Sequence, residues 1–372
     1  MGELDTLGDA VERLEWDERK EDESPHKSWR QFTRRSALTG GAAGIAALAL
    51  EACGGGSSSN SASGASSSSA SSVFGTGKSY KFTFVNHVTT NTFFTPTQNG
   101  AADACKLLGC SYQWTGSQNS VISEMVNAVD TAVTANVNGI AVSLIDPTAF
   151  NAPVSKALAA GIPVVAYNAD AAGNPRLAYI GQNLQLSGQM MGQHINSLVG
   201  SGDIGLFIAT PGSLNLQPRI NGAQQTLSKS ITPHVVATGA AQSQELTVVK
   251  SYIQSHSSYK GFFAVDGGST GATGLALQQL GSKAKGGGYD LDPNTQKTLA
   301  AGFMQFTIDQ QPYLQGFLPI LELYLYNATQ KLTGPADVDT GLKFLDKTTI
   351  QPYVTTKSRY EGTGTGVGVQ KA

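Results

Sequence analysis

From Lys81 onward the chain alternates short apolar runs with longer amphipathic stretches. The run 139–144 is almost continuously apolar, which is typical of a strand buried on both faces, whereas 121–134 places Val121 and Met125 on one helical stripe. Similar patterns predict strands at 81–85, 111–115, 163–167, 204–209, 235–238 and 261–265, and helices at 96–108, 151–160, 218–228, 245–256 and 271–280. Because strands alternate with helices, we predict an α/β fold whose parallel sheets are flanked by helices.

This alternation runs through the chain twice, with a break near 181–188. The region from about Tyr80 to Tyr353 is long enough for two lobes of ordinary domain size. We therefore predict two similar Rossmann-like lobes, each with its own sheet.

The N-terminal part has a different pattern. The arginine pair Arg34 and Arg35 precedes an apolar run at 37–50, which is too short to span a bilayer as a stable helix and is typical of a signal peptide. The pair resembles a twin-arginine export signal, and Cys53, followed by three glycines, resembles a lipoprotein processing site. Glu51 departs from the lipoprotein pattern, which usually has a small residue there. We predict export of the chain and lipid attachment through Cys53.

The segments outside the predicted lobes have little to bury. We assign 1–52 to an acidic N-terminal extension with the export signal, 53–78 to a flexible linker rich in Ser and Gly, and 356–372 to a disordered tail. No segment after the signal run is long and apolar enough to cross a membrane.

Charge excludes some partners. The chain has 25 Lys and Arg against 27 Asp and Glu, and 7 and 11 of these lie before Cys53, which leaves 18 against 16. A nearly balanced chain without a basic stripe is not expected to bind nucleic acid. Charged residues make up only 14% of the chain, so the surface is expected to be rich in neutral polar side chains.

Cysteine and histidine spacing gives no metal site. The five histidines are scattered and lack ligand-like spacing. Cys105 and Cys110 flank a four-residue segment, and in an exported chain they can either form a disulfide or serve as two small buried apolar residues. The sequence alone leaves both possibilities open because it fixes no Cα separation.

Polar and aromatic residues follow the predicted strands, where an open α/β sheet binds its ligands. These candidate ligand-binding residues are Asn91, Phe93, Phe94, Asn168, Asp170, Arg219, Asp266, Asp290 and Gln310. Amide and carboxyl groups can bond to vicinal hydroxyls, a guanidinium can bridge two oxygens, and aromatic rings can cover the C–H face of a sugar. Taken singly, Asp290 can be a helix N-cap and Asn168 a turn residue. Together, these residue types favour a small sugar or polyol as the ligand.

The region from about Lys81 to Tyr353 resembles the periplasmic binding proteins of ABC transporters for simple sugars, of the ribose-binding type. The motifs that carry the resemblance stand in the family's order: Thr90-Asn91-Thr92-Phe93-Phe94, Gln217-Pro218-Arg219-Ile220-Asn221-Gly222, Phe263-Ala264-Val265-Asp266, Gly288-Tyr289-Asp290 and Thr307-Ile308-Asp309-Gln310-Gln311-Pro312. The resemblance implies that Asn91, Arg219, Asp266 and Asp290 bond to sugar hydroxyls and that Phe93 and Phe94 sandwich the ring.

The same resemblance implies a type I periplasmic binding fold whose hinge-linked lobes close on the ligand. Lobe 1 is then expected to comprise 79–183 plus 311–340, and lobe 2 to comprise 184–310 plus 341–355. The implied partners are an ABC permease and its ATPase, with no cofactor and no catalysis. The chain is expected to be a monomer, held by its lipid at the outer face of the cytoplasmic membrane or in the periplasm.

One segment departs from the family. Its pentose binders usually carry an Asp-Arg pair after the fourth strand, where this chain has Asn168-Ala169-Asp170. This departure leaves the identity of the sugar open, and a polyol or nucleoside remains an alternative. Three other functions remain to be weighed: a sensor for a chemoreceptor or kinase, an exported glycosidase that uses Asp266 and Asp290, and a sugar-responsive repressor. The repressor lacks support because its DNA-binding end is replaced by an acidic segment and an export signal.

Overall fold

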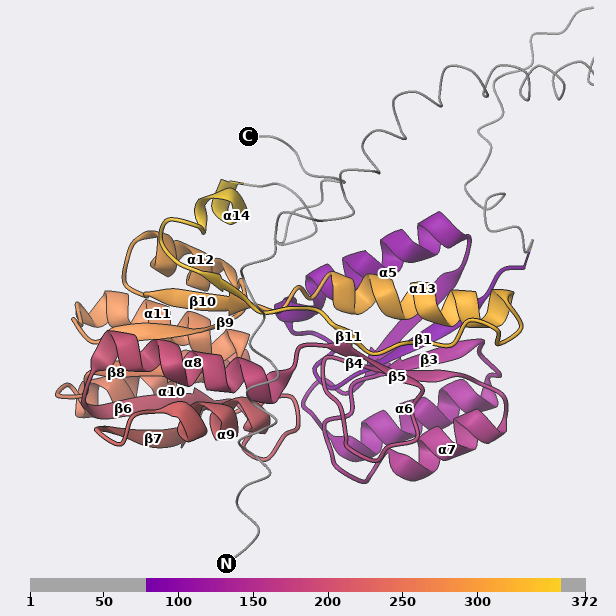
Figure 1. Ribbon diagram of the computed structural model, residues 1–372, viewed down its shortest axis with the longest axis horizontal. Coiled ribbons are helices and arrows are strands. Elements are labelled where there is room, and N and C mark those ends of the chain that lie inside the picture. The colour runs from indigo at the N-terminus through magenta and orange to yellow at the C-terminus, as the bar shows by residue number, and fades with distance from the viewer. Residues whose placement is uncertain (1–77, 356–372) are drawn as a thin grey trace, which may run out of the picture. The chain divides into compact units, whose positions relative to one another are not determined.

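The computed structural model describes residues 78–355 of the chain. Two six-stranded sheets organise this region (Figure 1). The first has the order β11-β5-β4-β3-β1-β2, and the second has the order β12-β10-β9-β8-β6-β7. The strands of the first sheet are β1 (Lys81–Asn86), β2 (Ser111–Gly116), β3 (Gly139–Val142), β4 (Val164–Tyr167), β5 (Ala178–Gly181) and β11 (Val338–Asp339). Those of the second are β6 (Gly202–Ile208), β7 (Ile231–Ala237), β8 (Gly261–Ala264), β9 (Lys285–Tyr289), β10 (Phe306–Asp309) and β12 (Lys343–Leu345).

Neighbouring strands are parallel in both sheets, except that β12 pairs antiparallel with β10. Helices cover each face of each sheet (Figure 1). In lobe 1, α5 (Thr95–Leu108) packs beside α13 (Leu314–Ala328), and α6 (Ile122–Thr134) packs beside α7 (Asn151–Ala159). In lobe 2, α8 (Leu184–Val199) packs beside α9 (Gln217–Thr226), and α10 (Gln242–Ser255), α11 (Gly267–Leu280) and α12 (Pro293–Ala300) pack in succession. The short η2 (Thr92–Phe94) precedes α5, and α14 (Gln351–Thr355) packs against α12.

The alternating apolar pattern of the strands builds a separate core on each face of a sheet. In β1, Phe82 and Phe84 pack on the side of α5 and α13, whereas Val85 joins the cluster on the side of α6 and α7. Lobe 2 repeats this arrangement, with Leu206 on the side of α8 and Phe207 on the side of α10. The α/β fold with parallel, helix-covered sheets in two lobes is therefore confirmed.

Three connections pass between the lobes. They join β5 to α8, β10 to α13, and β11 to β12. The second and third return the chain to lobe 1 and then to lobe 2, so each lobe is assembled from separated parts of the sequence. All three passages lie near the carboxyl ends of strands, where the polar residues singled out from the sequence are placed.

Several elements differ from the sequence prediction. Strand β5 was not predicted, because its sequence Ala-Tyr-Ile-Gly is short and lacks a clear alternation. Strand β7 begins at Ile231 rather than at Val235, since it carries a proline and a histidine that obscured the pattern at this sheet edge. The export signal with Arg34, Arg35 and Cys53 lies outside the described residues.

Cys105 and Cys110 are free thiols in the structure. Cys105 is buried in the last turn of α5, and the backbone N–H of Cys110 donates to its carbonyl oxygen at 3.0 Å. The two residues thus flank the left-handed Gly109 that ends the helix, where φ is 70°. Of the two possibilities left open by the sequence, the structure has the reduced pair.

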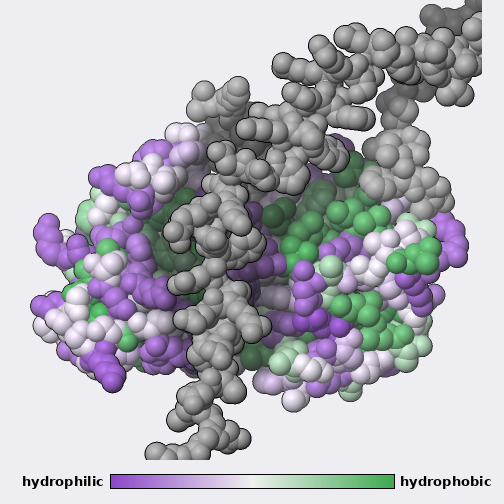
Figure 2. Space-filling model, in the orientation of Figure 1, coloured by the Kyte–Doolittle hydropathy of each residue, from purple (hydrophilic) through white to green (hydrophobic). Residues whose placement is uncertain are grey.

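Exposed apolar side chains are spread over many elements of the described region. On the face shown in Figure 2 they are intermixed with hydrophilic residues. The large ones are Leu107, Val121, Leu177, Leu186, Met190, Val235, Leu332 and Val354. No helix among residues 78–355 combines the length and the hydropathy needed to cross a membrane.

Helices α5 and α13 cross at two glycines. A Cβ atom on Gly316 would lie 1.8 Å from the carbonyl oxygen of Thr97, and one on Gly100 would lie 2.1 Å from the carbonyl oxygen of Tyr313. Any side chain here would push the helices apart. Because α13 directly follows the passage from β10, its contact with α5 fixes the position at which the chain re-enters lobe 1.

We expect Gly316→Ala to lower the free energy of unfolding by about 1–3 kcal/mol, since an added methyl group in a close-packed site forces the backbone to shift. Gly334→Ala is the matched control, because its Cβ would have no atom within 4 Å. Chemical denaturation of both variants measures the difference. Equal stability of the two variants would contradict the close crossing.

Candidate functional site

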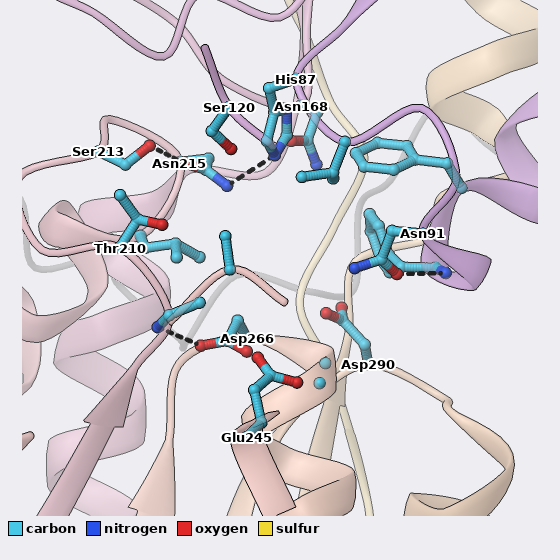
Figure 3. Close-up of a pocket in the computed structure, with 18 of the residues that line it drawn as sticks. His87, Asn91, Ser120, Asn168, Thr210, Ser213, Asn215, Glu245, Asp266 and Asp290 are labelled. Carbon is cyan, nitrogen blue, oxygen red and sulfur yellow. Dashed lines mark hydrogen bonds between the residues drawn. The ribbon is translucent and has the colours of Figure 1, made fainter. Parts of the chain in front are cut away.

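A pocket lies between the carboxyl ends of the two sheets (Figure 3). Its walls come from both lobes, and it brings together residues far apart in the sequence. Of the residues predicted from the sequence, it contains Asn91, Phe93, Phe94, Asn168, Arg219, Asp266, Asp290 and Gln310. Asp170 is not among its lining residues. The lining also includes His87, Ser120, Thr210, Ser213, Asn215 and Glu245, which the sequence analysis did not single out.

Asn168 and Asp290 occupy equivalent positions in the two lobes. Asn168 follows β4 and Asp290 follows β9, and each strand is third in its sheet order. Both residues have a left-handed backbone, with φ of 64° and 72°. Such strain in residues other than glycine concentrates at functional sites. Here the turn bends each side chain into the pocket at the end of its strand.

A buried hydrogen-bond network joins these two residues through amide side chains. Gln310 donates through Nε2 to Asp290 Oδ1 at 2.7 Å, and Gln315 donates through Nε2 to Gln310 Oε1 at 3.2 Å. Asn168 then donates through Nδ2 to Gln315 Oε1 at 3.2 Å. Thr340, in the third passage, adds a hydroxyl that donates to the carbonyl oxygen of Gln310 at 2.8 Å. The network therefore spans both lobes and two of the passages.

Arg219 is a buried cation in the first turn of α9, with 2% of its surface exposed. It donates through Nη1 to the carbonyl oxygen of Val265 at 2.8 Å and through Nη2 to Gln182 Oε1 at 3.0 Å. Its guanidinium lies 4.1 Å from the ring centroid of Tyr289, an arrangement that stabilises a cation. The Nε atom is buried and has no hydrogen-bond partner within the described residues.

Asp266 combines the capping role with a position in the pocket. It is the N-cap of α11, where Oδ1 accepts from Ser269 N at 2.8 Å. Its other oxygen accepts from Ala209 N at 2.9 Å. Burial raises the pKa of Asp266, and the two backbone N–H groups act in the opposite direction.

The pocket holds more acidic than basic side chains. Besides Asp266 it contains Asp290, whose pKa is raised to about 7 by burial, and Glu245, whose pKa is raised to about 8 by burial and by the charge of Asp266. Arg219 opposes the shift at Asp290. Glu245 was missed in the sequence because it lies in the first turn of α10 and follows no strand directly.

Aromatic rings close the lobe 1 side of the pocket. Asn91 Oδ1 accepts from Phe93 N at 2.9 Å and so caps η2. Phe94 is 1% exposed and meets Phe93 edge to face, with 4.7 Å between ring centroids. Its ring also contacts Trp114, which is partly buried against the core and donates through Nε1 to the carbonyl oxygen of Thr89 at 3.1 Å. Phe93 is only partly buried, so of the pair it is the ring better placed to cover a ligand.

Two contacts join the lobes across the mouth of the pocket. His87 of lobe 1 accepts at Nε2 from Asn215 Nδ2 of lobe 2 at 3.2 Å, with its Nδ1 3.1 Å from Ser143 Oγ. Burial lowers the pKa of His87 to about 4, which keeps the ring neutral for this contact. Beside it, Leu214 N donates to the carbonyl oxygen of Ile145 at 3.1 Å. These contacts describe lobes that are closed over the pocket.

Asp170 lies outside the pocket because an arginine holds it. Arg176 donates to it through Nε at 2.8 Å and through Nη2 at 2.5 Å. Arg176 also contacts Asp337, so the ion pairs tie the loop after β4 to the segment before β11. A cluster of three side chains suited to a metal ion is absent from residues 78–355.

Comparison with known proteins identifies the class. The chain matches the model of the periplasmic binding protein domain over residues 82–330. It belongs to this family, which confirms the resemblance noted in the sequence. It is 50% identical over 305 residues to the xylose/arabinose-binding protein XylF of Sulfolobus acidocaldarius, covering 77% of this chain and 76% of that protein.

Two solved structures extend the comparison. A solute-binding protein of an ABC transporter from Burkholderia graminis, in complex with D-arabinose, has a TM-score of 0.69 and 26% identity over 74% of this chain and 97% of that one. A carbohydrate transporter protein from Acidothermus cellulolyticus, in complex with myo-inositol, has a TM-score of 0.67 and 28% identity over 74% and 97%. The chain is therefore a binding protein of the sugar-transporter type rather than an enzyme, and its family implies an extracytoplasmic location.

The burial of Phe94 generates a stability prediction. We expect Phe94→Ala to lower the free energy of unfolding of the ligand-free protein by about 3–5 kcal/mol, because it leaves a cavity among four aromatic rings. Phe93→Ala should cost less, since its ring is only partly buried. Thermal or urea unfolding distinguishes the two. A larger loss for Phe93→Ala would show that the burial of the pair is assigned the wrong way round.

Proposed function

We propose that this chain is the substrate-binding lipoprotein of an ABC importer and that it binds a pentose of the xylose or arabinose type in the pocket between its lobes. The observation that carries the proposal is that three buried polar atoms of pocket-lining residues lack a hydrogen-bond partner within residues 78–355. Asn168 Oδ1, Arg219 Nε and Glu245 Oε2 all belong to residues that line this pocket. Buried polar atoms are rarely left unpaired, so a polar ligand is expected to satisfy them.

The pocket suits a neutral polyhydroxyl ligand. Asn168 Oδ1 and the carboxyl of Asp290 are acceptors for sugar hydroxyls, and Arg219 Nε is a charged donor. Phe93 supplies an apolar surface for the C–H face of the ring. Micromolar binding requires about 8 kcal/mol, which a few charge-assisted hydrogen bonds and ring burial are able to provide.

The ligands named for two relatives support a pentose over larger ligands. The curated relative at 50% identity is a xylose/arabinose-binding protein, and a structure at 26% identity contains D-arabinose. The structure at 28% identity contains myo-inositol, so a cyclic polyol is the second candidate ligand. This chain has Asn168-Ala169-Asp170 where the family's pentose binders have an Asp-Arg pair. The titration therefore has to compare sugars that differ in the configuration of their hydroxyl groups.

Delivery of the ligand to the permease would depend on closure of the two lobes. With the pocket closed, Leu214 and Asn215 of lobe 2 contact lobe 1, and the passages between the lobes absorb the rotation needed to open it. The closed form would present both lobes to a permease whose ATPase drives import. The predicted arginine pair and Cys53 would export the chain and attach it to the membrane.

We expect calorimetric titration to show micromolar or tighter binding of xylose or arabinose. The panel should include myo-inositol and a nucleoside, because the sequence leaves both open. Preferential binding of myo-inositol would replace the pentose by a polyol. Binding of none of these compounds would overturn the proposed function.

Variants test whether this pocket is the site. Asp290→Ala and Arg219→Ala should each weaken binding by tens- to thousandsfold, since removing one partner of a buried charged hydrogen bond costs about 2–5 kcal/mol. Asp170→Asn is the matched control: it changes a carboxylate that lies outside the pocket, and binding should remain within about twofold. Equal effects of Asp290→Ala and Asp170→Asn would place the ligand elsewhere.

The lipid anchor is tested in cells. Full-length protein should fractionate with membranes, and Cys53→Ser should release it, because Cys53 is the proposed site of lipid attachment. Cys110→Ser is the control and should remain with the membranes. Membrane retention of the Cys53→Ser protein would contradict the anchor.

A further inference from the structure

We propose that Glu245 is a further ligand-contacting residue and that it acts as a neutral carboxylic acid, donating a hydrogen bond to a ligand hydroxyl beside an ionised Asp266. This inference rests on the proposed function, since it assigns a role within the same pocket. It places a donor beside Asp266, whose carboxylate oxygens accept from backbone N–H groups. It also gives the pocket a means to favour neutral polyhydroxyl ligands.

The position of Glu245 is built by the local fold. The side chain leaves the first turn of α10 and reaches the start of α11, where it lines the pocket with Gly267 and Gly268. It is 3% exposed. A Cβ atom on Gly268 would lie 2.0 Å from Glu245 Oε2, so only glycine at this position leaves room for the carboxyl group. The carboxyl therefore occupies a space shaped for it.

Glu245 lacks the partners that a buried carboxylate requires. Its Oε1 accepts one long hydrogen bond, from Ser269 Oγ at 3.4 Å, and its Oε2 has no partner within the described residues. A buried carboxylate with so few donors is costly, whereas a protonated carboxyl can donate to a neighbour or a ligand. Within residues 78–355 the acceptor beside this carboxyl is Asp266, and Oε2 is left without a partner for the ligand to supply.

The neighbouring groups favour the proton on Glu245 rather than on Asp266. The carboxyl groups of Glu245 and Asp266 lie side by side (Figure 3), and two carboxylates in contact cannot both remain charged. Asp266 accepts from two backbone N–H groups and is influenced by Arg219, which favours its ionised form. Glu245 has no such donors, and Asp292 at the start of α12 adds a further negative charge.

Burial and these charges raise the pKa of Glu245 to about 8. The group is therefore protonated at neutral pH and loses its proton only as the pH rises through about 8. Asp290, the remaining acid of the pocket, contacts Gln310 and is influenced by Arg219. If binding requires the protonated form of Glu245, affinity should fall above that pH.

The test compares two variants with the wild-type protein by calorimetric titration of xylose and arabinose. Wild-type affinity should be about tenfold weaker at pH 9 than at pH 7, as expected when a required proton with a pKa near 8 is lost. Glu245→Gln keeps a hydrogen-bond donor that cannot ionise. Its sugar affinity at pH 7 should lie within about tenfold of the wild-type affinity, and it should not fall further at pH 9. Glu245→Ala should be weaker by tenfold or more at both pH values.

Gln244→Ala, on the exposed face of the same helix, is the matched control and should follow wild type. Glu245→Ala with wild-type affinity would overturn the contact, and Glu245→Gln with the pH dependence of wild type would overturn the proton donor. Failure of the wild-type protein to bind any sugar would instead overturn the proposed function, and the ligand role of Glu245 with it.

In that case the thermal stability of the ligand-free protein still tests whether Glu245 is protonated. Because the folded pKa is raised, wild-type Tm should fall as the pH rises from about 5 to 8, and Glu245→Gln should reduce that fall; an unchanged fall would overturn the neutral acid.

Discussion

The buried chain of amides from Asp290 through Gln310 and Gln315 to Asn168 is the constraint on which the rest of the site depends. Every group in this chain needs its hydrogen-bond partner because water is excluded. The two ends of the chain come from opposite lobes, and its middle residues lie at the passage between them. The network therefore couples the polar surface of the pocket to the passages between the lobes.

The equivalent placing of Asn168 and Asp290 shows how two similar lobes make one asymmetric site. Each residue ends the third strand of its sheet in a left-handed turn. One contributes an amide and the other a carboxyl, so the same backbone geometry presents different chemistry to the two sides of a ligand. The packing of the two sheets stabilises these strained turns, and the turns hold both side chains in fixed positions.

Most of the strand-end residues chosen from the sequence line the pocket, because the position of such residues follows from topology. Parallel strands bring their carboxyl ends to one edge, so Asn168, Asp266 and Asp290 could be assigned to a common crevice without knowledge of packing. Asp170 follows the same rule but is captured by Arg176, a contact that depends on the course of the loop between them. A pairing of this kind leaves no pattern in the sequence.

The residues that were missed have two different origins. His87 follows β1 directly, so the strand-end rule could have found it, whereas Glu245 and Asn215 lie where topology gives no signal. Glu245 lies in a helix and enters the pocket only because Gly268 makes room for it. His87 and Asn215 meet across the lobes, and their contact exists only when the lobes are closed. Most strands of the two sheets could be predicted from short apolar runs, whereas these contacts depend on the relative placing of segments far apart in the chain.

A crystal structure of the protein grown with its tightest-binding sugar tests the account most directly. The account predicts a single sugar between the lobes, with hydroxyl groups within hydrogen-bond distance of Asn168 Oδ1, Arg219 Nε and the Asp290 carboxyl, and with Phe93 against the ring. A sugar bound outside this pocket, or one bound within it while these atoms remain unpaired, would contradict the claim that the buried network is built to receive it.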